Sequence, residues 1–512
     1  MAVERSAPIL VASNRGPVSY ALGEDGSLTP KRGGGGLVSG LSAIGPDAGA
    51  VWVCAALGDG DREAARRAGA GHLAAADTGG QQVPPHQTPP QDSTGHLPTA
   101  HTGGQQVRML DIAPDVFAAA YNGVANSVLW FVHHLLYQTP VEPVFDAEFR
   151  AQWAAYETYN AAFADALAQE AAEGAVVLVQ DYHLALVPGL LRARRPDLRI
   201  GHFSHTPWAP PDYYRLLPDD VAAGVLRGIL GGDRAAFLTG RWAAAFADCC
   251  AAVLGAEVVR GPDGAAAAVR FEGRETRLGV HGLGADADFL RERSRAADVD
   301  ERLVALREQI GPGRKTIVRV DRTELSKNIV RGLLAYRRLL QTRPEWRERV
   351  VHVAFAYPSR QDLAVYRDYT ERVRVLAEEI NAEYGTEGWQ PVALHVKDDF
   401  ARSLAAYRLA DVALVNPIRD GMNLVAKEIP VVSERGCVLV LSREAGAYEE
   451  LGADAVVVNP YDIEGTARAL DEALRTPDAD RTDRTKRLAA AATALPPRDW
   501  FLAQLRALEQ QA

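Results

Sequence analysis

The sequence predicts an α/β protein that is built from two doubly wound domains. Short apolar runs of about four to eight residues alternate with longer amphipathic segments, most regularly between residues 315 and 474. This alternation is typical of parallel strands that are covered by helices on both faces. A chain of 512 residues is also too long for one hydrophobic core. Gly311-Pro-Gly313 indicates a linker just upstream of the second series, near residues 285–312.

The composition excludes several classes of protein. Hydrophobic residues make up 47% of the chain and charged residues 24%, which is typical of a soluble globular enzyme. The formal charge of −10 argues against nucleic acid as a main partner. Because no apolar run approaches about 18 residues and the first residues lack an apolar signal core, we expect no membrane association. The four cysteines lack metal-ligand spacing, and adjacent Cys249 and Cys250 are poor disulfide candidates, which favours the cytoplasm.

The first half begins with a predicted strand and a glycine-rich loop. The apolar runs predict strands at residues 8–13, 175–180 and 199–204, with helices at residues 145–173 and 184–195. The glycine run within residues 31–40 leads into a helix-like segment and is typical of a phosphate-binding loop, although a flexible loop has the same composition.

Residues 71–107 differ from the rest of the chain. The segment 71–83 recurs with few changes as residues 95–107, and Pro-, Gln- and Thr-rich sequence lies between the copies. A single duplication does not make a solenoid, which needs more copies to bury a core. We therefore expect a mobile surface insertion, and its scattered histidines do not have the spacing of a metal site.

The second half gives the clearer alternation of strands and helices. Strands are predicted at residues 315–320, 350–356, 392–396, 411–415, 437–441 and 455–458. Helices are predicted at residues 328–340, 363–383, 401–409, 445–451 and 463–474. Together these elements predict a Rossmann-like domain with a parallel sheet.

A polar turn at residues 416–428 follows the predicted strand 411–415. Doubly wound sheets bind their ligands at the carboxyl ends of strands, where this turn lies. Asn423 is the expected N-cap of a short helix that carries Glu428, and Pro430 is expected to stop or kink that helix early. Unpaired N–H groups together with Asp420 and Glu428 suit a ligand with both phosphate and sugar hydroxyls. The alternative is a polar loop that only connects strand to helix.

Two cations follow the predicted strand 315–320. Arg322 and Lys327 are five residues apart in one loop and are suited to bind a diphosphate, the arginine as a fork and the lysine as a point charge. The alternative is a solvated turn in which Asp321 and Glu324 pair with them. In the first half, two successive strands each end near a histidine, His183 and His205, which is more than we expect of ordinary loops. These features predict a nucleotide-sugar site.

The ordered set of motifs resembles the trehalose-6-phosphate synthase family of retaining glycosyltransferases. The matching segments are Ser13-Asn-Arg15, residues 34–37, residues 121–130, Asp181-Tyr-His183, His205, Arg322 with Lys327, residues 358–360 and residues 419–428. The resemblance implies two facing Rossmann-like domains of the GT-B type, with the active site in the cleft between them. We expect an acceptor domain at residues 1–285, a nucleotide-sugar domain at residues 286–495 and a final helix at residues 496–512 that crosses back.

The resemblance also implies a reaction and its residues. The family transfers glucose with retention from a nucleotide-glucose, UDP- or GDP-glucose, to glucose 6-phosphate, with no metal, cofactor or protein nucleophile. The implied catalytic residues are Asp181, His205, Arg322, Lys327 and Asp420. The implied donor-binding residues are Gly35, Arg322, Lys327, Asp420, Asn423, Leu424, Val425 and Glu428. The implied acceptor-binding residues are Arg15, Tyr121, Trp130 and Arg360.

The sequence departs from the family pattern at three places, the first of which is Pro430, where the helix is expected to stop or kink earlier than in relatives. Ala55 stands near a position where the family often has tryptophan, and the loop at residues 323–328 keeps both cations but not their usual neighbours. Two alternatives therefore stay open, namely a pseudo-glycosyltransferase that couples a nucleotide-cyclitol to an amino-cyclitol phosphate, and a non-catalytic sugar-phosphate sensor. A hydrolase is less favoured, because the carboxylates occur among phosphate-binding groups. The donor nucleotide and the oligomeric state, including a homo-oligomer, also stay open.

Overall fold

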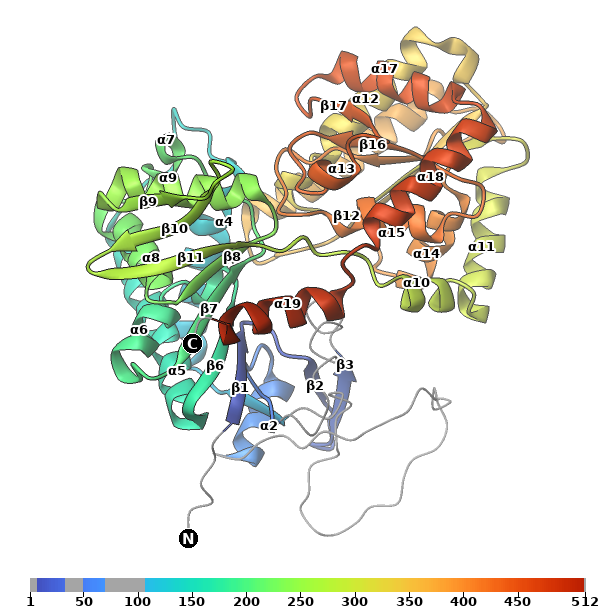
Figure 1. The fold of residues 1–512 in the computed structure, drawn as a ribbon. Helices are drawn as coiled ribbons and strands as arrows, with labels where there is room; N and C mark the ends of the chain where they lie inside the picture. Colours follow the sequence, from blue (N-terminus) through green and yellow to red (C-terminus); the bar gives the residue numbers. More distant parts are fainter. Residues whose placement is uncertain (1–6, 33–48, 70–105, 511–512) are drawn as a thin grey trace. The chain divides into compact units, whose positions relative to one another are not determined.

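The computed structural model describes residues 7–32, 49–69 and 106–510. The chain divides into two compact units, one formed by Met1–His281 with Pro497–Ala512 and the other by Gly282–Pro496. The change of unit after His281 comes four residues before the expected boundary at residue 285. Each unit is built on a largely parallel sheet with helices packed against it (Figure 1). This architecture confirms the predicted α/β fold class.

The second unit contains one sheet of six parallel strands, in the order β14-β13-β12-β15-β16-β17. The strands are β12 (Lys315–Arg322), β13 (Val350–Tyr357), β14 (Val392–His395), β15 (Val412–Val415), β16 (Val438–Ser442) and β17 (Val456–Val458). Counted along the chain within this unit, this is the 3-2-1-4-5-6 order of doubly wound sheets. The order reverses between β12 and β15. The loops that follow these two strands therefore lie at the topological switch point, where such folds bind ligands.

Two groups of helices accompany this sheet. The helices are α10 (Ala287–Arg293), α11 (Ala297–Ile310), α12 (Ile329–Thr342), α13 (Ala364–Tyr384), α14 (Phe400–Leu409), α15 (Leu424–Val432), α16 (Tyr448–Leu451), α17 (Ile463–Arg475) and α18 (Asp478–Ala492). Helix α12 packs against α13 and α17, whereas α15 packs against α10, α14 and α18. With helices on both faces, the strands are almost wholly buried, which explains their near-continuous apolar sequence.

The first unit repeats the same strand order in a larger sheet, β5-β4-β1-β6-β7-β8-β11-β10-β9. The strands are β1 (Ala7–Ser13), β4 (Val51–Ala55), β5 (Gln106–Leu110), β6 (Ala171–Gln180), β7 (Arg199–Ser204), β8 (Arg234–Phe237), β9 (Glu257–Arg260), β10 (Ala266–Phe271) and β11 (Arg274–Val280). In this sheet, β10 pairs antiparallel with both β9 and β11, and a separate hairpin joins β2 (Val18–Leu22) to β3 (Leu28–Arg32). The switch point of this sheet lies between β1 and β6.

The helices of the first unit include the last helix of the chain. They are α2 (Asp59–Ala68), α3 (Pro114–Ala118), a π-helix (Ala119–Leu129), α4 (Trp130–His134), α5 (Ala147–Glu170), α6 (Val187–Arg194), α7 (Pro211–Tyr214), α8 (Asp219–Leu230), α9 (Gly240–Leu254) and α19 (Pro497–Glu509). Helix α19 packs on β6 and β7, and Trp500 Nε1 donates to the His281 carbonyl oxygen at 3.1 Å. A Cβ at Gly201 would lie 2.8 Å from Leu508 Cδ1, so glycine permits this close packing.

Two predicted boundaries are wrong. The insertion was expected to reach residue 107, but Val107 is fully buried in β5 and pairs with Trp52, because strand pairing outweighs the polar composition around it. The helix predicted to end at residue 173 ends at Glu170, and Ala171 pairs with Ala7 as part of β6. Residues 70–105, which hold the rest of the expected insertion, lie outside the described residues.

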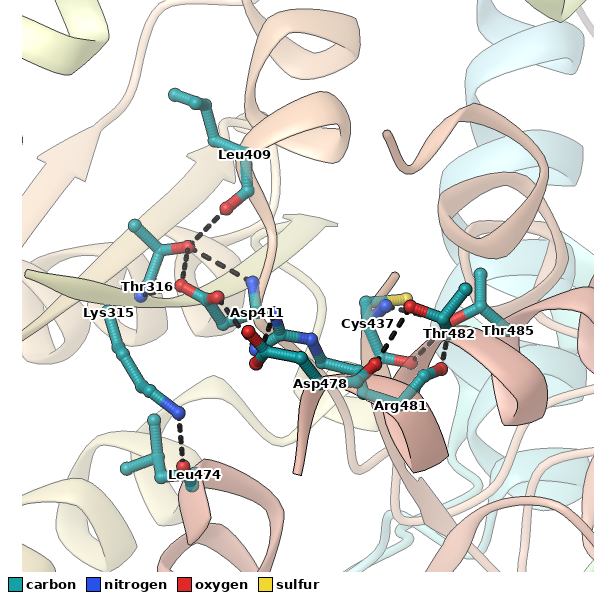
Figure 2. Close-up of polar contacts among 10 residues, drawn as sticks. All are labelled: Lys315, Thr316, Leu409, Asp411, Cys437, Leu474, Asp478, Arg481, Thr482 and Thr485. Atoms are coloured by element: carbon teal, nitrogen blue, oxygen red, sulfur yellow. Dashed lines mark hydrogen bonds and ion pairs between the residues drawn. The ribbon is translucent and has the colours of Figure 1, made fainter. Parts of the chain in front are cut away.

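A buried ion pair holds α18 at the amino ends of the strands in the second unit (Figure 2). Asp411 directly precedes β15, and its Oδ1 accepts from Arg481 Nη1 at 3.0 Å. Its other oxygen, Oδ2, accepts from the backbone N–H of Thr316 at 2.8 Å. Thr485 Oγ1 accepts from the Cys437 N–H at 2.8 Å, which ties α18 to β16 as well. Asp411 thus links β12, β15 and α18.

Replacement of Asp411 by alanine is expected to destabilise the protein by about 3–5 kcal/mol, because it leaves the Arg481 guanidinium buried and without this carboxylate. The measurement is the free energy of unfolding in urea. The matched control is Asp478→Ala, which removes the other carboxylate of Arg481, one that is 86% exposed and should contribute at most about 1 kcal/mol. Equal losses in the two variants would show that burial of the Asp411 pair is not what stabilises this region.

Candidate active site

The two loops at the switch point of the second unit are bonded to each other. The Ile418 N–H donates to the Ser326 carbonyl oxygen at 2.8 Å. Lys327, at the end of a short 3₁₀ turn (Leu325–Lys327), forms an ion pair with Asp420 in which Nζ and Oδ2 are 2.6 Å apart. The structure thus brings together one predicted diphosphate-binding cation and the predicted sugar-binding carboxylate. They are 93 residues apart in the sequence.

The charges around Lys327 keep its ammonium group protonated. Burial by itself lowers the pKa of the lysine, because it disfavours the charged form, but the carboxylates of Asp420, Glu324 and Asp321 outweigh burial and raise it. Asn423 Nδ2 also donates to Asp420 Oδ2 at 3.1 Å, which fixes the carboxylate from a second direction. The arrangement presents a fixed positive charge beside a fixed acceptor oxygen.

Helix α15 begins at the same place. Asn423 adopts a left-handed backbone with φ 75°, and its Oδ1 accepts from the Ala426 N–H at 3.1 Å, so it is the N-cap that the sequence predicts. The first N–H groups of an α-helix, here those of Leu424 and Val425, have no partner within the helix and attract anions. Glu428 lies in the second turn, where it accepts from the Tyr407 hydroxyl at 3.2 Å, and burial raises its pKa.

The expected early end of α15 is wrong. The helix continues through Pro430 to Val432, and the Ser433 N–H bonds to the Ile429 carbonyl oxygen at 2.9 Å. Proline removes one donor from the helix ladder. Pro430, Val431 and Val432 are buried, and the apolar area that they remove from water offsets the lost bond.

Arg322 is held by a different carboxylate from the one that holds Lys327. Its Nη2 lies 3.1 Å from Oε1 of Glu324, a fully buried side chain, and the arginine side chain itself is 59% exposed. Arg360 Nη1 lies 3.8 Å from the same oxygen and donates to the Tyr366 hydroxyl at 2.8 Å. The pairing of Arg322 with Glu324 that belongs to the alternative of a solvated turn therefore occurs, and it does not exclude an exposed arginine from binding phosphate. Sequence reasoning missed that Glu324 also approaches Arg360.

In the first unit, Asp181 and His205 follow the neighbouring strands β6 and β7. Asp181 Oδ1 accepts from the backbone N–H of His205 at 3.1 Å. The His205 ring donates from Nε2 to Gln180 Oε1 at 2.9 Å, and burial, followed by the charge on His202, lowers its pKa to about 4. His205 is therefore neutral near pH 7 and can hydrogen-bond to a hydroxyl group, but it does not supply a positive charge.

A π-helix brings Tyr121 and Trp130 onto one face. They are nine positions apart in the sequence. In an α-helix, with about 3.6 residues per turn, nine positions are about two and a half turns, so the two side chains would point in opposite directions. The π-helix is wider, with i→i+5 hydrogen bonds and roughly 4.4 residues per turn, so nine positions are about two full turns. Accordingly, the ring centroid of Tyr121 lies 5.4 Å from that of His183, and the ring centroid of Trp130 lies 5.8 Å from that of Tyr182, the preceding residue. Sequence periodicity carries no signal for this.

Backbone strain coincides with several predicted site residues. Seven residues other than glycine have positive φ in the described parts of the chain, and they include Asp181 at 73°, Arg360 at 50° and Asn423 at 75°. Such conformations cost about 1–3 kcal/mol each and collect at functional sites. This supports a functional rather than a merely connecting role for these loops.

Arg15 lies after β1, at the switch point of the first sheet, and is exposed. It lines a cavity of about 90 Å³ together with Gly16, Val18, Ser19, Ala55, Leu57 and Asp61. Ala55, which departs from the family pattern, thus lies beside the predicted acceptor residue. Gly35 and the rest of residues 33–48 lie outside the described residues.

Within the described ranges, no group of three or more His, Cys, Asp or Glu side chains has the arrangement of a metal site. In the same part of the chain, no helix has the length and apolar character needed to cross a membrane.

Comparison with known proteins gives consistent matches over almost the whole chain. The model of glycosyltransferase family 20 matches residues 10–510. An Aspergillus niger protein named alpha,alpha-trehalose-phosphate synthase [UDP-forming] 2 is 34% identical over 487 residues, which cover 94% of this chain and 92% of that protein. The bifunctional trehalose-6-phosphate synthase/phosphatase of Thermoproteus tenax is 36% identical over 371 residues, 72% of this chain and 48% of that protein.

Solved structures match over a similar extent. The E. coli trehalose-6-phosphate protein bound with UDP-2-fluoro glucose has a TM-score of 0.79 and 26% identity, and the match covers 98% of this chain and 99% of that one. An alpha,alpha-trehalose-phosphate synthase (UDP-forming) from Burkholderia xenovorans in complex with glucose-6-phosphate has a TM-score of 0.78, 26% identity and the same coverage.

Proposed function

Because the chain belongs to glycosyltransferase family 20, we propose that it is an α,α-trehalose-phosphate synthase. It transfers glucose, with retention of the anomeric configuration, from UDP-glucose to glucose 6-phosphate and releases UDP. Relatives that match over nearly their full length carry this name, and similar structures hold UDP-2-fluoro glucose or glucose-6-phosphate. The observation that carries the proposal is the Lys327–Asp420 pair beside the N-terminus of α15, at the switch point of a doubly wound sheet.

On the donor side, Lys327 and Arg322 bind the diphosphate. Both are cations, and the N–H groups of Leu424 and Val425 add the positive end of α15. Asp420 accepts from hydroxyl groups of the transferred glucose, and Glu428 accepts from the ribose. As the glycosidic bond breaks, negative charge grows on the departing diphosphate, and fixed cations stabilise that state more than the ground state.

On the acceptor side, the residues that we assign to glucose 6-phosphate are Arg15, Tyr121, Trp130 and Arg360. Asp181 and the neutral His205 hydrogen-bond to the reacting sugars. Retention needs no protein nucleophile in this scheme, because an oxygen of the leaving phosphate removes the proton of the acceptor hydroxyl on the same face.

We also infer a cytoplasmic location, because Cys54, Cys249, Cys250 and Cys437 are buried free thiols.

The test is the release of nucleoside diphosphate by the purified chain. With UDP-glucose, we expect release that depends on glucose 6-phosphate and is faster than with GDP-glucose. Preference for GDP-glucose would overturn the assigned nucleotide but not the reaction. Release that requires an amino-cyclitol phosphate instead would favour the pseudo-glycosyltransferase alternative. Binding of both substrates without release would favour the sugar-phosphate sensor.

A further inference from the structure

Arg319, in the middle of β12, is a fully buried charged side chain beneath the candidate donor site. Its Nη2 lies 2.7 Å from Asp321 Oδ2 and donates to the Lys327 carbonyl oxygen at 3.0 Å. Its Nη1 donates to Asn416 Oδ1 at 3.2 Å. One guanidinium group therefore touches both loops of the switch point, the one that carries Lys327 and the one that carries Asp420.

The surroundings of Arg319 are built to hold the guanidinium. A Cβ at Gly332, in α12, would lie 2.2 Å from Arg319 Nη1, so a larger residue there would displace the guanidinium from its present position. Asn328 Nδ2 donates to the Asn416 carbonyl oxygen at 2.9 Å, so the two loops stay joined on either side of the arginine. A charge that is fully out of water is expensive unless it is paired and hydrogen-bonded, and every group that satisfies Arg319 belongs to β12 or to these loops.

Two close ion pairs lie in this region, Arg319 with Asp321 and Lys327 with Asp420, and the Glu324 carboxylate also acts on Lys327. The pairs are not independent, because Asp321 also interacts electrostatically with Lys327. The side chain of Asp321 is only 8% exposed, so water screens the charge of its carboxylate little. If Arg319 were absent, the Asp321 carboxylate would attract the Lys327 ammonium group inward, away from Asp420.

We propose that Arg319 is a positioning residue for the donor diphosphate: it engages Asp321 and fixes the Lys327 backbone, so that the Lys327 ammonium group is directed to the ligand. This inference rests on the proposed function, which gives Lys327 its ligand. Arg319 itself touches neither substrate. Its effect is therefore expected on binding of the nucleotide part of the donor and not on binding of the acceptor.

The test compares Arg319→Met with Arg319→Met/Asp321→Asn. By calorimetry with UDP, and in parallel with GDP, we expect Arg319→Met to weaken nucleotide binding at least about tenfold, since a hydrogen bond to a charged group contributes about this much to affinity. The KM for glucose 6-phosphate should stay within about twofold. The double variant removes the competing carboxylate as well, so nucleotide affinity should recover by at least about threefold.

The controls separate positioning from stability. Arg314→Met removes another arginine of this unit, which bonds to the backbone carbonyl groups of Glu348 and Ile310 but lies before β12, and it should leave nucleotide affinity unchanged. If Arg319→Met does not fold, Arg319→Lys takes its place in the test, because lysine keeps the positive charge but lacks the several N–H donors of the guanidinium. Nucleotide binding is again expected to weaken. Unchanged nucleotide affinity, an equal effect on both substrates, or no recovery in the double variant would overturn the inference. UDP binding does not require turnover, so a wild-type chain that binds UDP but makes no product would refute only the proposed function.

Discussion

Replacement of Arg322 by alanine is expected to lower kcat/KM for the nucleotide-glucose by about 10²–10³-fold, roughly 2.7–4 kcal/mol of transition-state stabilisation. The reason is that the guanidinium is an exposed fork beside the donor loop, held at its base by the buried carboxylate of Glu324. Such a group stabilises the departing diphosphate most when its charge is largest, so kcat should fall together with kcat/KM. Steady-state kinetics at saturating glucose 6-phosphate provide the measurement.

The control for Arg322 is Arg374→Ala. That arginine, in α13, is 47% exposed and forms ion pairs with Glu371 and Glu378, so it resembles Arg322 in exposure and pairing but lies outside the two loops. Surface pairs of this kind contribute little, and activity should stay close to that of the wild type. If Arg322→Ala retained as much activity as Arg374→Ala, Arg322 would not be a donor-binding group.

Replacement of Lys327 by methionine is expected to have an effect of comparable or larger size, about 10³-fold or more on kcat/KM for the donor. The variant removes a cation and leaves the Asp420 carboxylate without its ion-pair partner. The loss should be smaller when it is measured in an Asp420→Asn background, because the two side chains act as a unit. Additive losses in this double-mutant cycle would contradict the coupling that their 2.6 Å contact implies.

The pH dependence of the wild-type enzyme gives a further check on Lys327. Burial opposes its charged form, but neighbouring carboxylates outweigh burial and raise its pKa above the usual 10.5. The stabilisation from its pairing is therefore fully present below the unfolded-state pKa and is lost only as the pH rises through the higher folded-state pKa. Between pH 7 and about 10, deprotonation of Lys327 should not limit the rate.

The sequence located most of the switch-point residues but not the strand order that makes them meet. Apolar runs predicted the strands that precede Arg322 and Asp420, because strands buried on both faces are almost continuously apolar. That β12 and β15 are neighbours depends on pairing between residues about a hundred positions apart, which local pattern does not contain. The chemistry of the two loops and the motif resemblance both predicted that Lys327 and Asp420 share a site, but neither contains the strand order that brings them together.

Three features were beyond sequence reasoning for distinct physical reasons. The common face of Tyr121 and Trp130 depends on the wider π-helix, whereas α-helical periodicity places them on opposite faces. The continuation of α15 through Pro430 reflects tertiary burial, which outweighs the local preference of proline. Arg319 looks like an ordinary charged residue in its strand, and its role depends on Asn416, 97 positions later.

The proposed reaction joins glucose to glucose 6-phosphate with retention of the anomeric configuration. The most direct measurement is the NMR spectrum of the product formed from UDP-glucose and glucose 6-phosphate by the purified chain. We predict α,α-trehalose 6-phosphate, with an α-linked anomeric signal from the transferred glucose and one equivalent of UDP. A product with inverted configuration, or no disaccharide phosphate with any nucleotide-glucose, would contradict the proposed reaction.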